Sequence, residues 1–213
     1  MSTSTSSVIT PAKLRQADDE FVVAVLDAMK IPYKTWGTGK STKTLKNFLG
    51  NWHLGKITWD PESSSDTIEI DIAVVTVVWE INNFKRELRE KYRQLKNGRV
   101  PKHHELPGSL AETLRHSDTS LIAALRGLGE KLGQVKPGFM DPARFQLTPL
   151  VPTALEPVPS VDYPGFNVKF TYWPLLCQVN EHLYEEEYVF EEPDKTTYWH
   201  WVNITPEVAP KKP

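Results

Sequence analysis

The chain has 213 residues, enough for one domain with extensions, so its length predicts a single core of two or three layers. The 25 basic and 27 acidic residues give a formal net charge of -2 and are spread along the chain, which argues against nucleic acid and anionic membranes as partners. The single cysteine, Cys177, excludes an internal disulfide, and no basic-then-apolar segment opens the sequence, so we expect a cytoplasmic protein. Apolar runs such as 72–79 are too short to span a bilayer.

The first 66 residues predict a helical extension rather than part of the main domain. Residues 1–9 are mostly serine and threonine and are expected to be disordered. Thr10 and Pro11 suit the N-cap and first position of a helix that Pro32 ends. Its apolar face consists of Leu14, Phe21, Val22, Val25, Leu26 and Met29. Ser41 or Thr42 is expected to cap a second, short helix. We expect this extension to pack on the domain. The sequence leaves the oligomeric state open, and a homodimer is one alternative.

The remaining elements alternate between strands and one clear helix. Residues 67–81 are β-branched and predict a long central strand, and 85–96 suit either a solvated helix or, as we favour, a hairpin turning at Asn97-Gly98. Leucines 121, 125, 128 and 132 predict a helix from Asp118 to Leu132, capped by Ser117 and stopped by Gly133. Prolines between 149 and 164 predict a surface loop. Further strands are expected at 166–179, 184–192 and 196–202, before a tail at 205–213.

One segment carries a family resemblance. Glu105-Leu-Pro-Gly-Ser-Leu-Ala-Glu-Thr-Leu, followed by Leu121-Ile-Ala-Ala-Leu-Arg-Gly-Leu-Gly-Glu-Lys-Leu-Gly133, resembles the Nudix box, G-x5-E-x7-R-E-U-x-E-E-x-G-U. The order of strands around this segment is also similar to that of Nudix domains. The resemblance implies an α/β (α+β) fold, a Nudix-like α/β/α sandwich with a mixed central sheet over residues 67–204, to which the N-terminal helix is added.

Carried over residue by residue, the box is incomplete. Arg126, Leu128, Glu130 and Gly133 match the family's arginine, apolar position, first late glutamate and closing glycine. Two glutamates of the late part of the motif are replaced, one by Lys131 and the one after the arginine by Gly127. In the early part, Asp118 stands at the glutamate and Glu112 at the first glycine. With a different loop length, Gly108 could fill the place of that glycine.

Nudix chemistry needs hard divalent cations held by several carboxylates on one helix. The resemblance therefore implies Mg²⁺ or Mn²⁺ with Glu130, Asp118 and Glu112 as ligands, Glu130 as metal ligand or base and Arg126 as its orienter. His104, which precedes the box, could serve as a catalytic acid or base beside a cleft, although a surface position is the favoured explanation. A lysine at position 131 weakens such a metal site by repulsion, although it could itself neutralise a phosphate. The alternative for Glu130 is a solvated i,i+4 ion pair with Arg126. The acidic residues between 181 and 192 could lend carboxylates to a metal or only protect an edge strand.

Aromatic residues suggest a ligand pocket. Trp199 and Trp201 share one face of a strand and could, with Lys131, bind a planar or apolar small molecule, although core packing is the favoured explanation. Three functions remain open. The first is a divergent hydrolase of a diphosphate-containing or activated small molecule. The second is a catalytically degenerate Nudix-fold binding module, and the third is a metal-free isomerase or cyclase using the same cleft.

Overall fold

The computed structural model describes residues 19–38, 43–63, 65–81, 84–96, 98, 108–193 and 195–204. The chain divides into two compact units, one of residues 1–71 with 154–171 and one of residues 72–153 with 172–213. The helices are α2 (Asp19–Ala28), η1 (Tyr33–Thr35), α3 (Leu45–His53), α4 (Ser120–Lys131), η2 (Pro137–Met140), η3 (Pro142–Arg144) and η4 (Glu181–Leu183). None of the helices in these ranges is long and apolar enough to cross a membrane.

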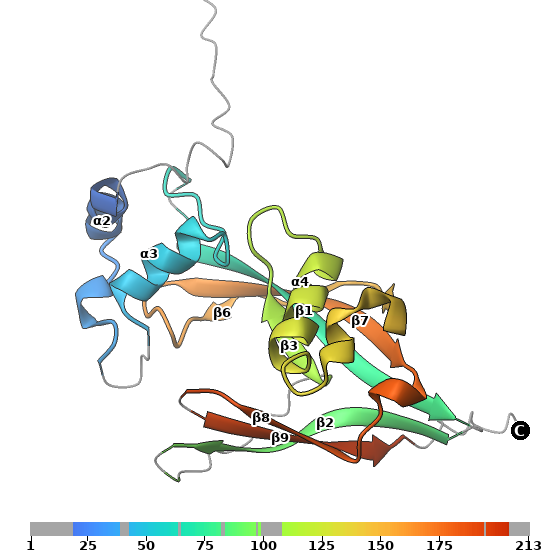
Figure 1. The fold of residues 1–213 in the computed structure, drawn as a ribbon. Coiled ribbons are helices and arrows are strands. Elements are labelled where there is room, and N and C mark those ends of the chain that lie inside the picture. The colour runs from blue at the N-terminus through green and yellow to red at the C-terminus, as the bar shows by residue number, and fades with distance from the viewer. Residues whose placement is uncertain are drawn as a thin grey trace, which may run out of the picture. The chain divides into compact units, whose positions relative to one another are not determined.

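The strands form one sheet, shown in Figure 1. They are β1 (Thr67–Ile81), β2 (Phe84–Leu95), β3 (Leu110–Thr113), β4 (Phe145–Pro149), β5 (Thr153–Ala154), β6 (Val158–Pro159), β7 (Asn167–Val179), β8 (Glu187–Glu191) and β9 (Lys195–Asn203). The main order is β4-β7-β1-β2-β9-β8, with β3 added beside β1 and with β5 and β6 beside β7. The combination of this sheet with helices confirms the α+β class.

The sheet is mixed, as expected. The strands β2, β3, β4, β8 and β9 pair antiparallel with their neighbours. In contrast, the N–H of Asn167 donates to the carbonyl of Asp66 at 2.7 Å and Lys169 pairs with Glu69 at 3.0 Å, so β7 starts beside the start of β1 and runs in the same direction (Figure 1).

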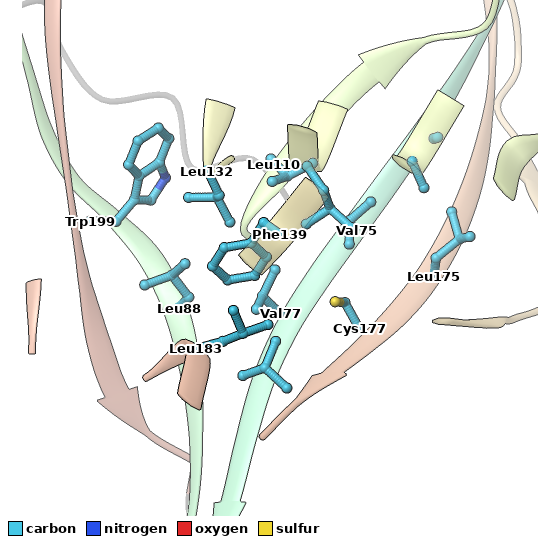
Figure 2. Packing of buried hydrophobic residues seen from close by; sticks show 14 of the residues in the cluster. Val75, Val77, Leu88, Leu110, Leu132, Phe139, Leu175, Cys177, Leu183 and Trp199 are labelled. Atoms are coloured by element: carbon cyan, nitrogen blue, oxygen red, sulfur yellow. The ribbon is translucent and has the colours of Figure 1, made fainter. Parts of the chain in front are cut away.

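Two partners share one side of β1, and this divides the second unit into two layers. Residues 78–81 of β1 pair with 84–87 of β2, whereas residues 72–75 pair with 110–113 of β3. Strand β2 therefore leaves β1 and continues with β9 and β8 as a separate layer. Figure 2 shows the apolar core between these layers, with Val75 and Val77 from β1 facing Leu88 from β2 and Trp199 from β9.

The first unit has its own aromatic core. Phe48 of α3 stacks on Phe166 at 5.5 Å between ring centroids, and Trp36 and Tyr163 pack around it. The N-cap of α3 is Thr44, so the cap expected at 41 or 42 is wrong. The reason is a capping box in which Thr44 and Asn47 each bond the other's backbone N–H. Helix α2 confirms the expected first helix from Asp19 onward, while its expected start at Thr10 lies outside the described residues.

Several expected boundaries in the second unit need correction. Residues 84–95 form a strand, as favoured, and its described partners are β1 and β9. Asn97 and residues 99–107, where the second strand of the expected hairpin would begin, lie outside the described residues. Strand β8 begins at Glu187 rather than at Tyr184. Tyr184 is the C-cap of η4, and its N–H donates to the carbonyl of Glu181.

The expected loop between prolines 149 and 164 is also partly wrong. Two short strands, β5 and β6, pair with β7 inside this segment. Pro159 lies in β6 opposite Asn167, and proline, which has no N–H to donate, fits such a marginal strand.

Candidate functional site

Helix α4 carries the residues that resemble the Nudix box, and its start is set by local hydrogen bonds. The hydroxyl of Thr119 accepts from the N–H of Ile122 at 3.3 Å, which makes Thr119 the N-cap and the expected cap at Ser117 wrong. Ser117 instead adopts a φ of 66°, and Asp118 uses its carboxylate to accept from the N–H of Arg115 at 2.8 Å. The turn before α4 is thereby held in place by Asp118.

Gly127 lies where α4 contacts strand β3. A Cβ atom at this position would be 3.2 Å from the Cβ of Glu112 and 3.3 Å from Cδ1 of Leu110. A glutamate here, as the family motif has, would therefore displace one of these neighbours. The glycine at this position is explained by the close packing of helix on strand.

Arg126 binds two of the carboxylates that the sequence suggested as metal ligands. Its Nη1 donates to Asp118 at 2.6 Å, its Nε donates to Glu112 at 3.2 Å, and its Nη2 donates to the carbonyl of Thr113 at 2.9 Å. The side chains of Arg126, Asp118 and Glu112 are only 14%, 13% and 12% exposed. This is a largely buried, charge-assisted network that fixes α4 against β3.

The network favours the charged forms of Asp118 and Arg126. Partial burial acts to raise the pKa of Asp118, but the N–H of Arg115 and the guanidinium of Arg126 outweigh it and hold that pKa below the ordinary value. Burial likewise acts to lower the pKa of Arg126, and the bonds to Asp118 and Glu112 raise it instead. Asp118 is therefore ionised at neutral pH.

Glu130 lies apart from this network. Its carboxylate is 3.8 Å from Arg115 Nη2, and its side chain is 54% exposed. The alternative of an i,i+4 pair with Arg126 is therefore wrong, because Arg126 turns towards Asp118 and Glu112. Glu130 and Arg126 do lie on one open pocket of about 300 Å³, whose walls also include Leu125, Gly129, Phe139 and Met140.

Lys131 faces the other layer of the unit. Its Nζ donates to the carbonyl of Ala111 at 2.9 Å. Burial lowers its pKa most strongly, while the charges of Glu112 and Glu192 raise it and those of Arg93 and Lys195 lower it further. Among the described residues, no carboxylate lies within ion-pair distance of this ammonium group.

The two expected tryptophans lie on the face of β9 that meets the core. Trp199 is 3% exposed and Trp201 is partly buried against the same cluster. The indole of Trp201 donates to the carbonyl of Glu185 at 2.7 Å, whereas that of Trp199 has no acceptor among the described residues. Core packing thus accounts for most of the surface of Trp199 but not for its N–H.

Sequence reasoning missed the partners on β2 and at the turn between β8 and β9. Glu90 lies opposite Trp199 in the register and accepts from Arg93 at 2.8 Å. Glu192, which was considered as a supplementary metal ligand, instead pairs with Lys195 at 3.0 Å. A register for β2 and β9 would have revealed these neighbours, and the sequence gives no direct signal for it.

The expected metal ligands are not brought together as a divalent cation requires. Asp118 and Glu112 bind Arg126, and Glu130 lies near Arg115. Within the described parts of the chain, no three His, Cys, Asp or Glu side chains are placed to hold a metal ion. The residues there do not fit Mg²⁺ or Mn²⁺ as they stand, and His104 lies outside the described residues.

Comparisons of the chain with models of protein families, with curated proteins and with solved structures find no match.

Proposed function

We propose that this chain is a catalytically degenerate Nudix-like module that binds a small molecule without divalent-metal hydrolysis. The observation that carries the proposal is the network of Arg126, because the arginine holds both Asp118 and Glu112. In a metal-dependent site those carboxylates would have to face the cation instead.

The energetic argument follows from burial. A cation that took Asp118 and Glu112 as ligands would separate both from Arg126, whose guanidinium is 14% exposed. Breaking a buried ion pair costs about 3–5 kcal/mol, because the abandoned charge stays out of water. This cost opposes metal binding before any coordination bond forms.

Lys131 adds a second obstacle at the position of a late Nudix glutamate. Its ammonium group donates a hydrogen bond to the carbonyl of Ala111 and interacts electrostatically with Glu112. A unit charge and a divalent cation 4 Å apart repel by about 8 kcal/mol at an effective dielectric constant of 20. A positive side chain suits an anionic ligand better than it suits a metal ion.

Space for a ligand is available beside the same helix. The pocket of about 300 Å³ next to Arg126 and Glu130 is at the lower end of the volumes that bind small molecules. The divergent hydrolase remains the rival function, with Glu130 as its metal ligand or base.

The test combines binding and turnover. Nucleoside and isoprenoid diphosphates are titrated in EDTA by calorimetry, and release of phosphate or pyrophosphate is then measured with Mg²⁺ or Mn²⁺. We expect binding in EDTA and no release with either metal. Metal-dependent release that Glu130→Gln abolishes, and that the exposed control Glu156→Gln leaves intact, would overturn the proposal and establish the hydrolase.

A further inference from the structure

Two side-chain N–H groups on the inner face of β2 and β9 have no acceptor. They are the Nε of Arg93 and the Nε1 of Trp199, which are buried and unpaired among the described residues. A third group of this kind, the Nε of Arg115, lies near Glu130. Buried donors are almost always paired in folded proteins, so an unpaired set calls for an acceptor that the described residues do not supply.

The first two donors belong to one place in the fold. Trp199 lies opposite Glu90 and Thr197 lies opposite Arg93, so all four side chains are on the same face of the two strands. Arg93 also binds Glu90 at 2.8 Å, which holds it on this face. Figure 2 shows the indole of Trp199 extending from β9, with its nitrogen on the side that faces Leu132.

Lys131 meets this face from the end of α4. It immediately precedes Leu132, which packs in the same core cluster as Trp199. Its ammonium group is within the electrostatic range of Arg93 and of the turn residues Glu192 and Lys195. The side chain remains partly exposed, so a ligand can approach it.

The carboxylates in this region are already engaged. Glu90 binds Arg93, Glu192 binds Lys195 at 3.0 Å and Glu112 binds Arg126 at 3.2 Å. Within the described ranges, the ammonium group of Lys131 has a peptide carbonyl and no carboxylate as its partner. Among the same residues, the Nε of Arg93 and the Nε1 of Trp199 have no acceptor. These are the groups that a ligand with a negative oxygen-bearing group would bind.

We propose that Lys131 Nζ, Arg93 Nε and Trp199 Nε1 together bind one oxyanion group, a carboxylate or a phosphate, of the small-molecule ligand. Recognition is direct, through charge-assisted hydrogen bonds, and no divalent cation bridges the ligand to the protein. The inference rests on the proposed binding function, because it names a chemical group of the ligand that such a module binds.

The indole N–H of Trp199 gives a direct readout. In ¹H–¹⁵N spectra of the full chain, the signal is assigned by its loss in Trp199→Phe. Inorganic phosphate and acetate are titrated separately in EDTA, with chloride added to a matched ionic strength in the reference. We expect a saturable downfield shift of this signal with at least one anion, and the responding anion identifies phosphate or carboxylate as the preferred group.

Two lysine variants separate a site from a general salt effect. Lys131→Met keeps most of the half-buried apolar stem and removes the charge, so the anion affinity should fall at least tenfold. Lys91→Met is the matched control, because Lys91 pairs with Glu187 on an exposed part of β2 and should leave the affinity unchanged. Well-dispersed backbone signals establish that each variant is folded, and calorimetric titration of Trp199→Phe with the same anion gives a second measure if Lys131→Met unfolds.

The inference is overturned if neither anion produces a saturable shift, if Lys131→Met binds as tightly as the unmodified chain, or if Lys131→Met is unfolded and Trp199→Phe keeps full affinity. These outcomes differ from failure of the proposed function, which would appear as metal-dependent release of phosphate. Diphosphates that bind in EDTA while the Trp199 signal stays unchanged would retain the binding module and remove only this oxyanion site.

Discussion

Replacing Arg126 by methionine should destabilise the second unit strongly. The substitution keeps a long apolar stem and removes the guanidinium, which leaves Asp118 and Glu112 as unpaired carboxylates that are 13% and 12% exposed. The carbonyl of Thr113 also loses its donor. Removing one partner of a buried ion pair costs about 3–5 kcal/mol, and the partial exposure places the expected loss near the lower end, about 3 kcal/mol.

Urea unfolding followed by tryptophan fluorescence measures this loss, and the pH dependence tests its cause. Because the native pKa of Asp118 lies below its unfolded value, its contribution is fully present above the unfolded pKa and is lost as pH falls through the native pKa. The stability gap between wild type and Arg126→Met should therefore be full at pH 7 and shrink below about pH 4. At a typical 2–4 °C per kcal/mol, Tm should fall by about 6–12 °C at pH 7.

The control is Arg144→Met, whose partner Asp141 and own side chain are each about half exposed, at 52% and 53%. An exposed pair of this kind contributes less than about 1 kcal/mol, so this variant should unfold nearly as the wild type does. A loss below about 1 kcal/mol for Arg126→Met, or a gap that stays the same at pH 3, would refute the proposed network.

Three further predictions concern packing. Gly127→Glu should destabilise by about 1–3 kcal/mol in urea unfolding and should not create metal-dependent phosphate release, because its Cβ would press on Glu112 at 3.2 Å; unchanged stability would contradict the packing argument. Burial raises the pKa of Cys177 to about 12, so a thiol-specific reagent should label it only after unfolding, and fast labelling of the native chain would show the strand to be accessible. Phe48→Ala should cost about 3–5 kcal/mol in thermal or urea unfolding, because it empties the centre of the aromatic core, and a loss below 1 kcal/mol would contradict that placement.

Residue spacing along the sequence predicted the helix and the strand that bury one continuous face. The leucine spacing of α4 and the β-branched run of β1 placed both correctly, because each pattern follows directly from one face of the element being buried. The caps were harder. Ser117 and Thr119 are both adequate N-caps by residue type, and the choice of Thr119 depends on Asp118 binding Arg115 and Arg126.

The site was predicted only in part, because its side-chain pairs join residues on different elements of the fold. Glu112, Asp118 and Arg126 were each recognised from the box, but their mutual pairing joins β3, a turn and a helix and has no sequence signature. Glu90 and Arg93 were not recognised at all. Their position opposite Trp199 and Thr197 depends on a register that includes an irregularity between Glu90 and Tyr92, and a shift of one residue would point them to the opposite face.

One packing distance links Gly127 and Lys131, two residues at which the chain differs from the Nudix motif that it resembles. Gly127 lets α4 lie close to β3, because a Cβ atom here would be only 3.2 Å from Glu112 and 3.3 Å from Leu110 and would push these neighbours aside. The same closeness places Arg126 within reach of Glu112 at 3.2 Å and Lys131 within reach of the Ala111 carbonyl at 2.9 Å, both of them on β3. A larger residue at 127 would move the helix away and alter both contacts. The paired Glu112 and the half-buried Lys131 therefore both depend on one helix–strand contact, so introducing a single glutamate at position 127 would not create a metal site.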